Sequence, residues 1–190
     1  ALAGCTSNDE DESEDDSTEE TDVVTDVVKI GFLNPATGPL AQDAAGFEYG
    51  ALQAAIDLNA AQNTTTFEVV VADSGCDGTT GAAAAQTLAD AGVVAVAGAA
   101  CSGASMAANA VLSAAGIPMI SYASTNPSLS NASAYPDFFR VVPSDAIQGP
   151  AAAAMMAILD AESPAILHMT NDYGSGFADA IEGAWDGDVC

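Results

Sequence analysis

The chain has 190 residues, 49% of them hydrophobic, and carries 27 acidic but only two basic side chains, for a formal net charge of −25. Such an acidic surface repels phosphate backbones, so we expect no nucleic-acid partner. The apolar content is sufficient for a buried core, but the sequence contains no run of about eighteen apolar residues that could span a bilayer.

The N-terminal region, 1–26, combines a candidate lipidation site with an acidic spacer. Leu2-Ala3-Gly4-Cys5 has the form of a lipobox, so we expect a lipid anchor on Cys5, with an ordinary buried or free cysteine as the alternative. The segment 6–25 is acidic, rich in Ser and Thr, and almost free of large apolar side chains. It cannot bury enough surface to offset its ordering entropy, which predicts a disordered spacer.

From residue 27 onward, apolar β-branched runs alternate with amphipathic, alanine-rich stretches. The predicted strands are Val27–Leu33, Phe67–Ala72, Val93–Ala97, a short run that ends near Tyr122, Phe138–Val142 and Ala165–Met169. The predicted helices are one marked by apolar positions from Phe47 to Leu58, then Thr79–Ala91, Ala104–Ala115, Ala146–Leu159 and Gly176–Trp185. This alternation predicts an α/β fold with a parallel sheet that is covered by helices on both faces.

Loops at the carboxyl ends of parallel strands form the ligand sites of such folds. Here these loops are Asn34–Asp43, Asp73–Gly78, Gly98–Ser105, Ser121–Thr125 and Thr170–Gly176. The segment Gly98–Ser105 follows a predicted buried strand and opens a helix, where unpaired N–H groups and the Ser102 hydroxyl could bind a carboxylate. An ordinary helix start capped by Ser102 or Ser105 is the alternative. The segment lacks the G-x-G-x-x-G fingerprint of dinucleotide sites.

Hydroxyl side chains also follow the next predicted strand, in the segment Ser121–Pro127. Since the loops after neighbouring parallel strands meet in one crevice, we expect Ser124 and Thr125 to join Ser102 around the same anionic group. Taken alone, Thr125-Asn126-Pro127 indicates only a turn.

Four cysteines are present, and two of them follow predicted strands. In an oxidising compartment Cys76 and Cys101 are natural partners, because both would lie at the same sheet edge. Two unpaired thiols are the alternative. With Cys5 assigned to lipid, Cys190 has no partner within the chain.

The sequence offers no catalytic constellation. His168 is the only histidine, and its place in the predicted strand Ala165–Met169 favours a buried core residue. There is no G-x-S-x-G motif and no second histidine for a triad or a metal site. We therefore expect a protein that is not an enzyme and needs no cofactor or metal.

Several segments taken together resemble the leucine/isoleucine/valine-binding protein family, the type I periplasmic binding proteins that feed ABC importers. The resemblance covers about Val28 to Trp185. Its motifs are Thr37-Gly38-Pro39-Leu40-Ala41, Asp73-Ser74-Gly75-Cys76-Asp77, Ala100-Cys101-Ser102, Ser121–Pro127, Phe139-Arg140, Gln148-Gly149-Pro150 and Asn171–Gly176.

The resemblance implies two lobes that close on a ligand about a hinge. Residues 27–142 would form the N-terminal part of the first lobe, and 143–190 the hinge crossing and a truncated second lobe. It implies an extracytoplasmic, membrane-anchored protein that captures an amino acid, of branched-chain type or related, for an ABC permease. A ligand-sensing ectodomain of a signalling receptor is the alternative.

The resemblance also assigns binding roles to individual residues. The positions of Ser102 and Thr125 bind the carboxylate of the amino acid in family members, and the backbone at the position of Ala123 receives its ammonium. The position of Tyr173 contributes from the second lobe. The family pattern also supports a bridge between Cys76 and Cys101.

Overall fold

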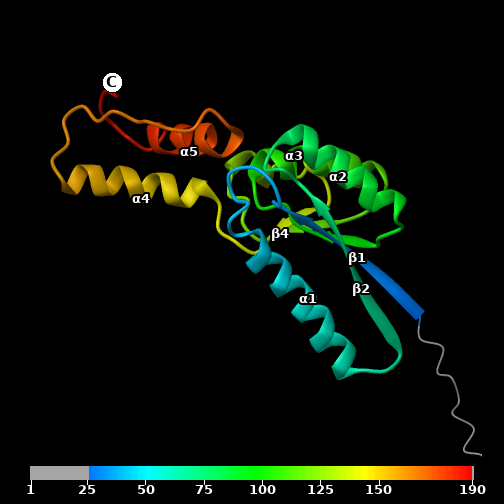
Figure 1. The fold of residues 1–190 in the computed structure, drawn as a ribbon. Coiled ribbons are helices and arrows are strands. Elements are labelled where there is room, and N and C mark those ends of the chain that lie inside the picture. The colour runs from blue at the N-terminus through cyan, green and yellow to red at the C-terminus, as the bar shows by residue number, and fades with distance from the viewer. Residues whose placement is uncertain (1–25, 190) are drawn as a thin grey trace, which may run out of the picture.

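A five-stranded parallel sheet forms the centre of residues 26–189, the part of the chain that the computed structural model describes (Figure 1). The strands follow the order β2-β1-β3-β4-β5, and every neighbouring pair is parallel. Their bounds are β1 (Asp26–Asn34), β2 (Thr65–Asp73), β3 (Ala95–Ala97), β4 (Met119–Ser121) and β5 (Phe138–Arg140). The predicted parallel α/β architecture is confirmed. The candidate lipobox with Cys5, the spacer at 6–25 and Cys190 lie outside the described residues.

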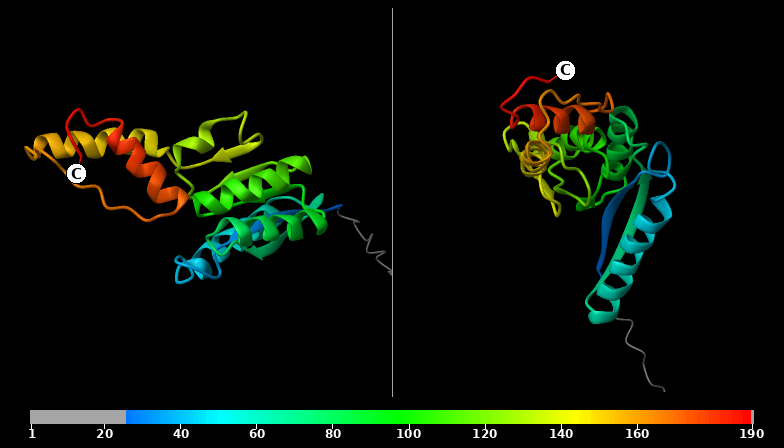
Figure 2. Two further views of the ribbon diagram at one scale, coloured as in Figure 1. Left: turned by 90° about the horizontal axis from the view of Figure 1, so that it is seen from above. Right: turned by 90° about the vertical axis from the view of Figure 1, so that its left-hand side faces the viewer.

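Helices or turns connect the strands, and two more helices follow the sheet. They are α1 (Ala44–Ala61), α2 (Gly78–Asp90), α3 (Ser102–Ala114), the 3₁₀ turn η1 (Pro127–Ser130), α4 (Asp145–Ile158) and α5 (Asp172–Glu182). We call residues 26–141 the sheet part and residues 145–189 the α4–α5 part. In the left view of Figure 2, as in Figure 1, α4 and α5 extend away from the sheet part.

Consecutive residues of β1 point to opposite faces of the sheet, and helices cover both faces. Leu33 is fully buried in a core formed with α2 and α3, which includes Leu88 and Leu112. Phe32 points to the other face, where its ring stacks on that of Tyr122 with centroids 5.5 Å apart. Phe47 of α1 meets the same tyrosine at 5.2 Å. The period of two along the strand therefore assigns α2 and α3 to one face and α1 to the other.

The core between α2 and α3 depends on small side chains. Gly81 is buried, and a Cβ atom added there would lie 2.9 Å from the carbonyl oxygen of Ala104. Alanines from both helices fill the rest of this contact, including Ala85 and Ala108, which are fully buried. The high alanine content of the sequence thus allows two helices to lie close together over one face of the sheet.

The predicted strand Ala165–Met169 is wrong. The segment is irregular, the Leu167 side chain is fully exposed, and His168 is exposed instead of lying in a core. An apolar run becomes a strand only when a neighbouring strand satisfies its backbone groups. No strand pairs with this segment among residues 26–189.

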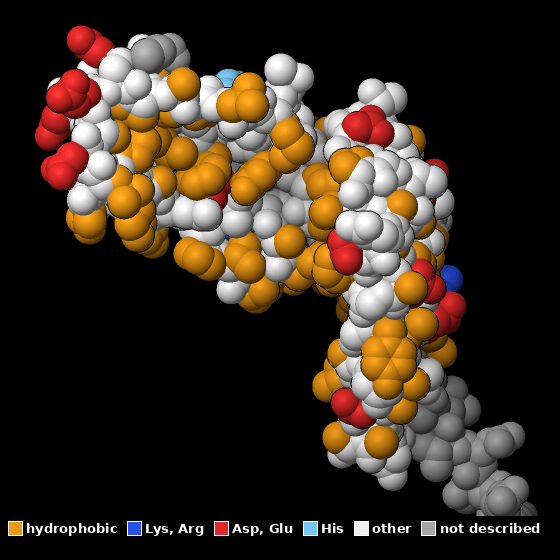
Figure 3. Space-filling view, turned by 60° about the vertical axis from the view of Figure 1, so that its left-hand side comes forward, with side chains coloured by type: hydrophobic (Ala, Val, Ile, Leu, Met, Phe, Trp, Pro, Cys, Tyr) orange, Lys and Arg blue, Asp and Glu red, His pale blue; other side chains and the backbone are white. Residues whose placement is uncertain are grey.

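Two helices carry apolar side chains that nothing in residues 26–189 covers. Ile147, Met155 and Ile158 are exposed on α4, and Tyr49 and Ile56 are exposed on α1. In Figure 3, hydrophobic side chains gather over the α4–α5 part and again along α1. These two faces are free for further contacts. None of the helices in residues 26–189 is both long and apolar enough to cross a membrane.

Candidate ligand-binding site

A cavity of about 590 Å³ lies where the carboxyl ends of the strands face the α4–α5 part. All five loops that the sequence analysis singles out reach it or border it. Its lining residues are Pro39, Leu40, Cys76, Asp77, Gly78, Ala100, Cys101, Ser102, Gly103, Ala123, Thr125, Gln148, Met169, Asn171, Asp172 and Tyr173. A volume of this size accommodates a small organic molecule.

A disulfide between Cys76 and Cys101 fixes one wall of the cavity. The two Cα atoms are 5.1 Å apart, and the bond joins the loop after β2 to the start of α3. The loop after β1 packs against the same wall, because Gly38 approaches the carbonyl group of Gly75 too closely for any side chain. Gly38 also has a φ of 85°, which favours glycine. Three loops are therefore held together at one rim.

Ser102 is the first residue of α3, and it presents hydrogen-bond donors to the cavity. The preceding Cys101 forms no side-chain cap, so the amides of the first helical turn keep their donor capacity. The Ser102 hydroxyl oxygen accepts a hydrogen bond from the Asn126 N–H at 3.3 Å, which leaves the hydroxyl proton for another partner. With the partial positive charge of a helix N-terminus, this wall suits a carboxylate.

Thr125 lines the cavity next to this wall and is held by Asp145, the first residue of α4. The Thr125 hydroxyl donates to Asp145 Oδ2 at 2.8 Å, and the Asp145 N–H donates to the Thr125 carbonyl oxygen at 2.9 Å. Because the hydroxyl has one proton and donates it to Asp145, its oxygen faces other groups as an acceptor.

Ser124 does not line the cavity. Only 1% of its surface is exposed, and its hydroxyl donates to the carbonyl oxygens of Ala99 and Ala100 at 3.1 and 3.2 Å. It also contacts the Ser105 hydroxyl at 2.8 Å. Ser121 joins the same cluster by donating to Ala99 O at 2.6 Å. These buried hydroxyls tie the loop after β4 to the loop after β3, and so hold the residues above them in position.

Ala123 and Tyr173 reach the cavity from opposite sides. The Ala123 N–H donates to the Ser121 hydroxyl at 3.2 Å, so the buried hydroxyl cluster holds the loop after β4 in place. Tyr173 lies in the first turn of α5, where its ring stacks on that of Phe177 with centroids 6.2 Å apart. The structure thus brings Ser102, Thr125, Ala123 and Tyr173 to one cavity, and keeps Ser124 beneath it.

The charged side chains that line the cavity are both acidic. The Asp77 carboxylate accepts hydrogen bonds from the Thr80 hydroxyl and from two N–H groups at the start of α2, and these bonds hold its pKa below the usual value. Asp172 reaches across from α5, and its carboxylate lies so close to Gly103 that a side chain there would collide with it. No lysine or arginine belongs to this lining, so the cavity disfavours ligands that carry a net negative charge.

Asn126 connects the sheet part to the α4–α5 part beside the cavity. Its side-chain amide donates to the Asp172 carbonyl oxygen, while its side-chain oxygen accepts from the Ser128 N–H at 2.8 Å. The Asn126 side chain is 4% exposed, and it packs so tightly against Gly176 that a side chain there could not fit. One buried amide therefore holds the first turn of α5 at the mouth of the cavity.

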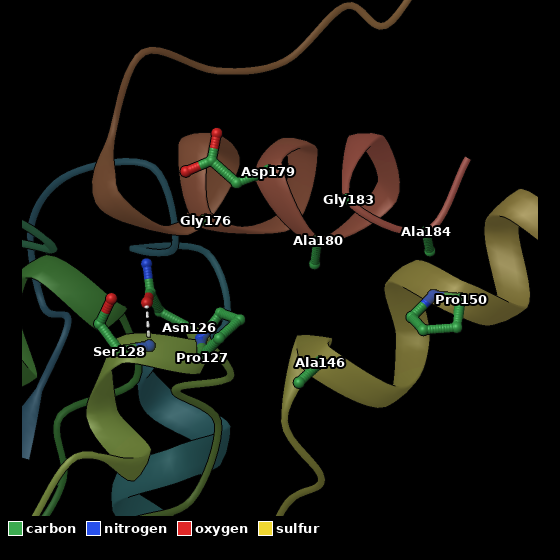
Figure 4. A pocket seen from close by; sticks show the side chains of 10 residues that line it. All are labelled: Asn126, Pro127, Ser128, Ala146, Pro150, Gly176, Asp179, Ala180, Gly183 and Ala184. Atoms are coloured by element: carbon green, nitrogen blue, oxygen red, sulfur yellow. Dashed lines mark hydrogen bonds between the residues drawn. The ribbon is translucent and has the colours of Figure 1, made fainter. Parts of the chain in front are cut away.

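A second cavity, of about 420 Å³, lies between η1, α4 and α5 (Figure 4). Ala146 and Pro150 of α4, Ala180 of α5 and Ala184 just beyond α5 are among the residues that line it. Asp179 points away from α4 in Figure 4. The wall formed by α4 consists of small apolar groups, while Asn126 and Ser128 are the polar groups on the side of η1.

Sequence reasoning missed several residues of the larger cavity. Gln148 and Asp172 line it, and Asp145 is buried behind Thr125 without lining it. The two aspartates carry weak signals on their own, since acidic residues are ordinary in the first turn of a helix. Ser144 and Asn171 do show the expected cap pattern, because their side chains accept from the N–H groups of Ala146 and Gly174. What the sequence does not reveal is that these helix starts face the loops of the sheet part.

A parallel sheet whose carboxyl-end loops surround one cavity is the arrangement in which α/β proteins bind small molecules. A family profile described as "Receptor family ligand binding region" matches residues 47–186. The chain belongs to this family. The resemblance to leucine/isoleucine/valine-binding proteins is confirmed by the individual relatives.

Two relatives of known name match most of the chain. An amino acid binding protein of Pseudomonas aeruginosa is 36% identical over 164 residues, which are 84% of this chain and 43% of that protein. The Leu/Ile/Val-binding protein of Escherichia coli K12 is 32% identical over 160 residues, which are 82% of this chain and 43% of that protein. The chain therefore spans less than half the length of these relatives.

The fold also matches a solved structure that holds a ligand. The branched-chain amino acid transporter substrate-binding protein LivJ of Streptococcus pneumoniae, in complex with isoleucine, has a TM-score of 0.74 and 29% sequence identity. The match covers 86% of this chain and 48% of that one.

Proposed function

We propose that the chain is part of a binding protein that captures a free amino acid in the 590 Å³ cavity. This proposal rests on one observation: a surface that donates hydrogen bonds and a fixed acceptor lie side by side in one cavity. The start of α3, with Ser102, offers donors to a carboxylate, whereas the Thr125 hydroxyl is fixed as an acceptor beside it. A zwitterion, with its carboxylate next to its ammonium, complements both.

In this proposal the carboxylate receives hydrogen bonds from the Ser102 hydroxyl, the first amides of α3 and the Thr125 N–H. The ammonium donates to the Thr125 hydroxyl oxygen and to the Ala123 carbonyl oxygen. Ser124 supports the loop from below and does not touch the ligand. Tyr173 covers the ligand from α5, which excludes water and strengthens these charge-assisted bonds.

The division into lobes belongs to the same proposal. Residues 27–142 supply the carboxylate-binding wall, and residues 143–190 begin the second lobe, which moves about a hinge near Ser144. The buried Asn126 amide, which contacts the start of α5, is the kind of contact that would form on closure. The rest of the ligand's surroundings would come from the length of the relatives that the chain does not span.

We propose that the cavity binds its ligand without catalysing a reaction. His168 is not among its lining residues, and its Nδ1 lies 2.9 Å from the Met169 carbonyl oxygen. Among the described residues of the lining, no serine or cysteine has a basic side chain within hydrogen-bond reach, since Ser102 meets a backbone N–H and Cys101 is in the disulfide.

The relatives and the disulfide support a proposal for the partners and the location. The LivJ structure is that of a transporter substrate-binding protein, and we propose an ABC permease as the partner of this chain. The Cys76–Cys101 bridge fits an extracytoplasmic compartment, where disulfides persist. A lipid on Cys5 would keep the protein at the membrane surface, which radiolabelled lipid incorporation into wild type but not into Cys5→Ser can test.

Isothermal calorimetry of the full-length protein against a panel of amino acids tests the function. We expect at least one tight ligand, and Ser102→Ala should weaken its binding about tenfold or more, because a hydrogen bond to a charged group is lost. Ser133→Ala is the matched control, since Ser133 is exposed and lies outside the cavity. Absence of binding to any amino acid would overturn the proposal.

A sensory role is the second candidate, because the family that matches the chain is described as a ligand-binding region of receptors. The same cavity would then report on ligand instead of delivering it. Uptake of the bound amino acid into vesicles that contain the cognate permease distinguishes the two roles. Ligand-dependent uptake supports transport, whereas a protein that binds ligand but never stimulates uptake supports sensing.

A further inference from the structure

Asp172 places its carboxylate at the start of a helix other than its own. It is the first residue of α5, but its side chain reaches across the cavity to Gly103, the second residue of α3. The Asp172 carboxylate leaves no room for a Cβ atom at Gly103, so it occupies the place of a side chain there. Because Gly103 belongs to the sheet part and Asp172 to the α4–α5 part, this contact joins the two parts across the cavity.

Backbone contacts hold the Asp172 residue in this position. The Asn126 side-chain amide, which is buried, donates to the Asp172 carbonyl oxygen. Asn171 caps α5 on the other side, since its side chain accepts from the Gly174 N–H at 2.8 Å. The Asp172 carboxylate can therefore leave α3 only by rotation of its own side chain or by movement of α5.

The N-termini of two helices attract the Asp172 carboxylate at once. It lies in the first turn of α5, and it touches the first turn of α3, where the preceding Cys101 forms no side-chain cap. The start of each helix carries a partial positive charge that stabilises a nearby anion. No lysine or arginine of residues 26–189 lines the cavity, so these helix ends supply the positive field around Asp172 there.

We propose that Asp172 is an internal competitor of the ligand carboxylate and thereby limits the affinity of the site. This inference rests on the proposed amino-acid binding, which puts the ligand carboxylate at the same end of α3. Two neighbouring carboxylates repel each other, so the Asp172 side chain must move aside when the ligand enters. Binding then costs the favourable interaction between Asp172 and the start of α3.

The ligand carboxylate should be the stronger of the two competitors. Asp172 meets Gly103 where a Cβ atom would be attached, which is a C–H position and not an N–H group. In the proposed binding mode, the ligand carboxylate instead receives hydrogen bonds from the Ser102 hydroxyl and from amides of α3. Charge-assisted hydrogen bonds of this kind are stronger than a contact through the field of the helix alone. Asp172 therefore lowers the affinity without blocking the site.

Calorimetry on the full-length protein tests this competition with L-leucine and with leucinamide, in which an uncharged amide replaces the carboxylate. Asp172→Asn keeps the size of the side chain and removes its charge. It should tighten leucine binding about threefold or more, because the competing anion is gone. Leucinamide should not bind more tightly, since it is a cation and gains nothing from the loss of a negative charge. An unchanged or weaker affinity for leucine, or an equal gain for both ligands, would overturn the proposal.

A gain in affinity also separates competition from damage to the fold. Loss of the negative charge at the start of α5 destabilises that helix, which by itself would weaken binding. Asp179→Asn is the matched control, because Asp179 is exposed on the same helix and does not line the cavity. It should change the affinity for leucine by less than about twofold, since solvent screens an exposed charge outside the cavity. An equal gain in both variants would assign the effect to net charge and refute the competition.

A measurement without ligand keeps this inference separate from the proposed function. In NMR spectra of the unliganded full-length protein, Asp172→Asn should shift the amide signals of Ser102, Gly103 and Ala104, whereas Asp179→Asn should not. Failure of wild type to bind any amino acid would refute the proposed function, and the competition with it. If wild type binds an amino acid but these signals do not move in Asp172→Asn, the inference alone is refuted.

Discussion

Removal of the Cys76–Cys101 bridge should destabilise the sheet part strongly. The bridge closes a loop with a sequence separation of 25 residues between the ends of β2 and β3. In the chain-entropy model, a loop of this length lowers the entropy of the unfolded chain enough to stabilise the folded state by about 3–4 kcal/mol. That is a large share of the stability of an ordinary domain.

The bridge should also affect the ligand. Both cysteines line the cavity, and Cys101 immediately precedes Ser102 at the start of α3. Without the bridge, the wall that holds the carboxylate becomes free to move relative to the loop after β2. We therefore expect the double variant Cys76→Ser, Cys101→Ser to bind ligand more weakly as well as to unfold more easily.

Denaturant unfolding, followed by circular dichroism, measures the first effect. The double variant should lose about 3–4 kcal/mol of unfolding free energy relative to oxidised wild type. Addition of a reductant should destabilise wild type by a similar amount and leave the double variant unchanged, which controls for the serine substitutions. A double variant within about 1 kcal/mol of oxidised wild type would refute the entropic argument.

Three further predictions follow from packing and charge. Gly81→Val should cost about 1–3 kcal/mol of unfolding free energy in denaturant titrations, because its side chain would collide with Ala104, and an unchanged stability would contradict the close packing of α2 and α3. Burial alone would raise the pKa of Asp73, but hydrogen bonds from Thr37 and from the Gly75 N–H hold this pKa below its usual value. The contribution of Asp73 to the free energy of unfolding should therefore be complete above about pH 4 and be lost as the pH falls through the lowered pKa. Asp73→Asn should thus be less stable than wild type at pH 7 and equal to it near pH 2, in acid unfolding curves, and a difference independent of pH would exclude this explanation. Glutamate should bind at least about tenfold more weakly than leucine in calorimetry, since Asp77 and Asp172 line the cavity, and comparable affinities would refute the electrostatic argument.

Much of the sheet part could be predicted from the sequence because local pattern and tertiary structure agree there. The run Val27–Leu33 falls within β1, and Phe67–Ala72 falls within β2. Each is rich in β-branched or aromatic residues and is followed by turn residues. The strand predicted at Val93–Ala97 is shorter in the structure, since β3 spans only Ala95–Ala97.

The segment Ala165–Met169 shows that an apolar run alone does not specify a strand. It has the same apolar character as the true strands, but its backbone finds no neighbouring strand within the described residues. Its side chains, apart from the half-buried Ile166, are consequently exposed, including His168. A strand is specified by its partners as well as by its own residues, and these partners are remote in sequence.

The candidate site could likewise be predicted only in part. Ser102 and Thr125 could be predicted because their positions follow strands whose carboxyl ends share an edge. The burial of Ser124 could not, because it depends on contacts with Ala99 and Ala100 in another loop. The hydrogen bond between Thr125 and Asp145 likewise joins residues twenty positions apart, which no local pattern reveals.

A crystal structure of the full-length protein with its tightest amino-acid ligand tests the account most directly. We predict the ligand carboxylate at the start of α3, within hydrogen-bond distance of Ser102 and of the Thr125 N–H, and the ammonium against the Thr125 hydroxyl oxygen. A ligand bound outside this cavity, or bound with its ammonium at the start of α3, would contradict the account.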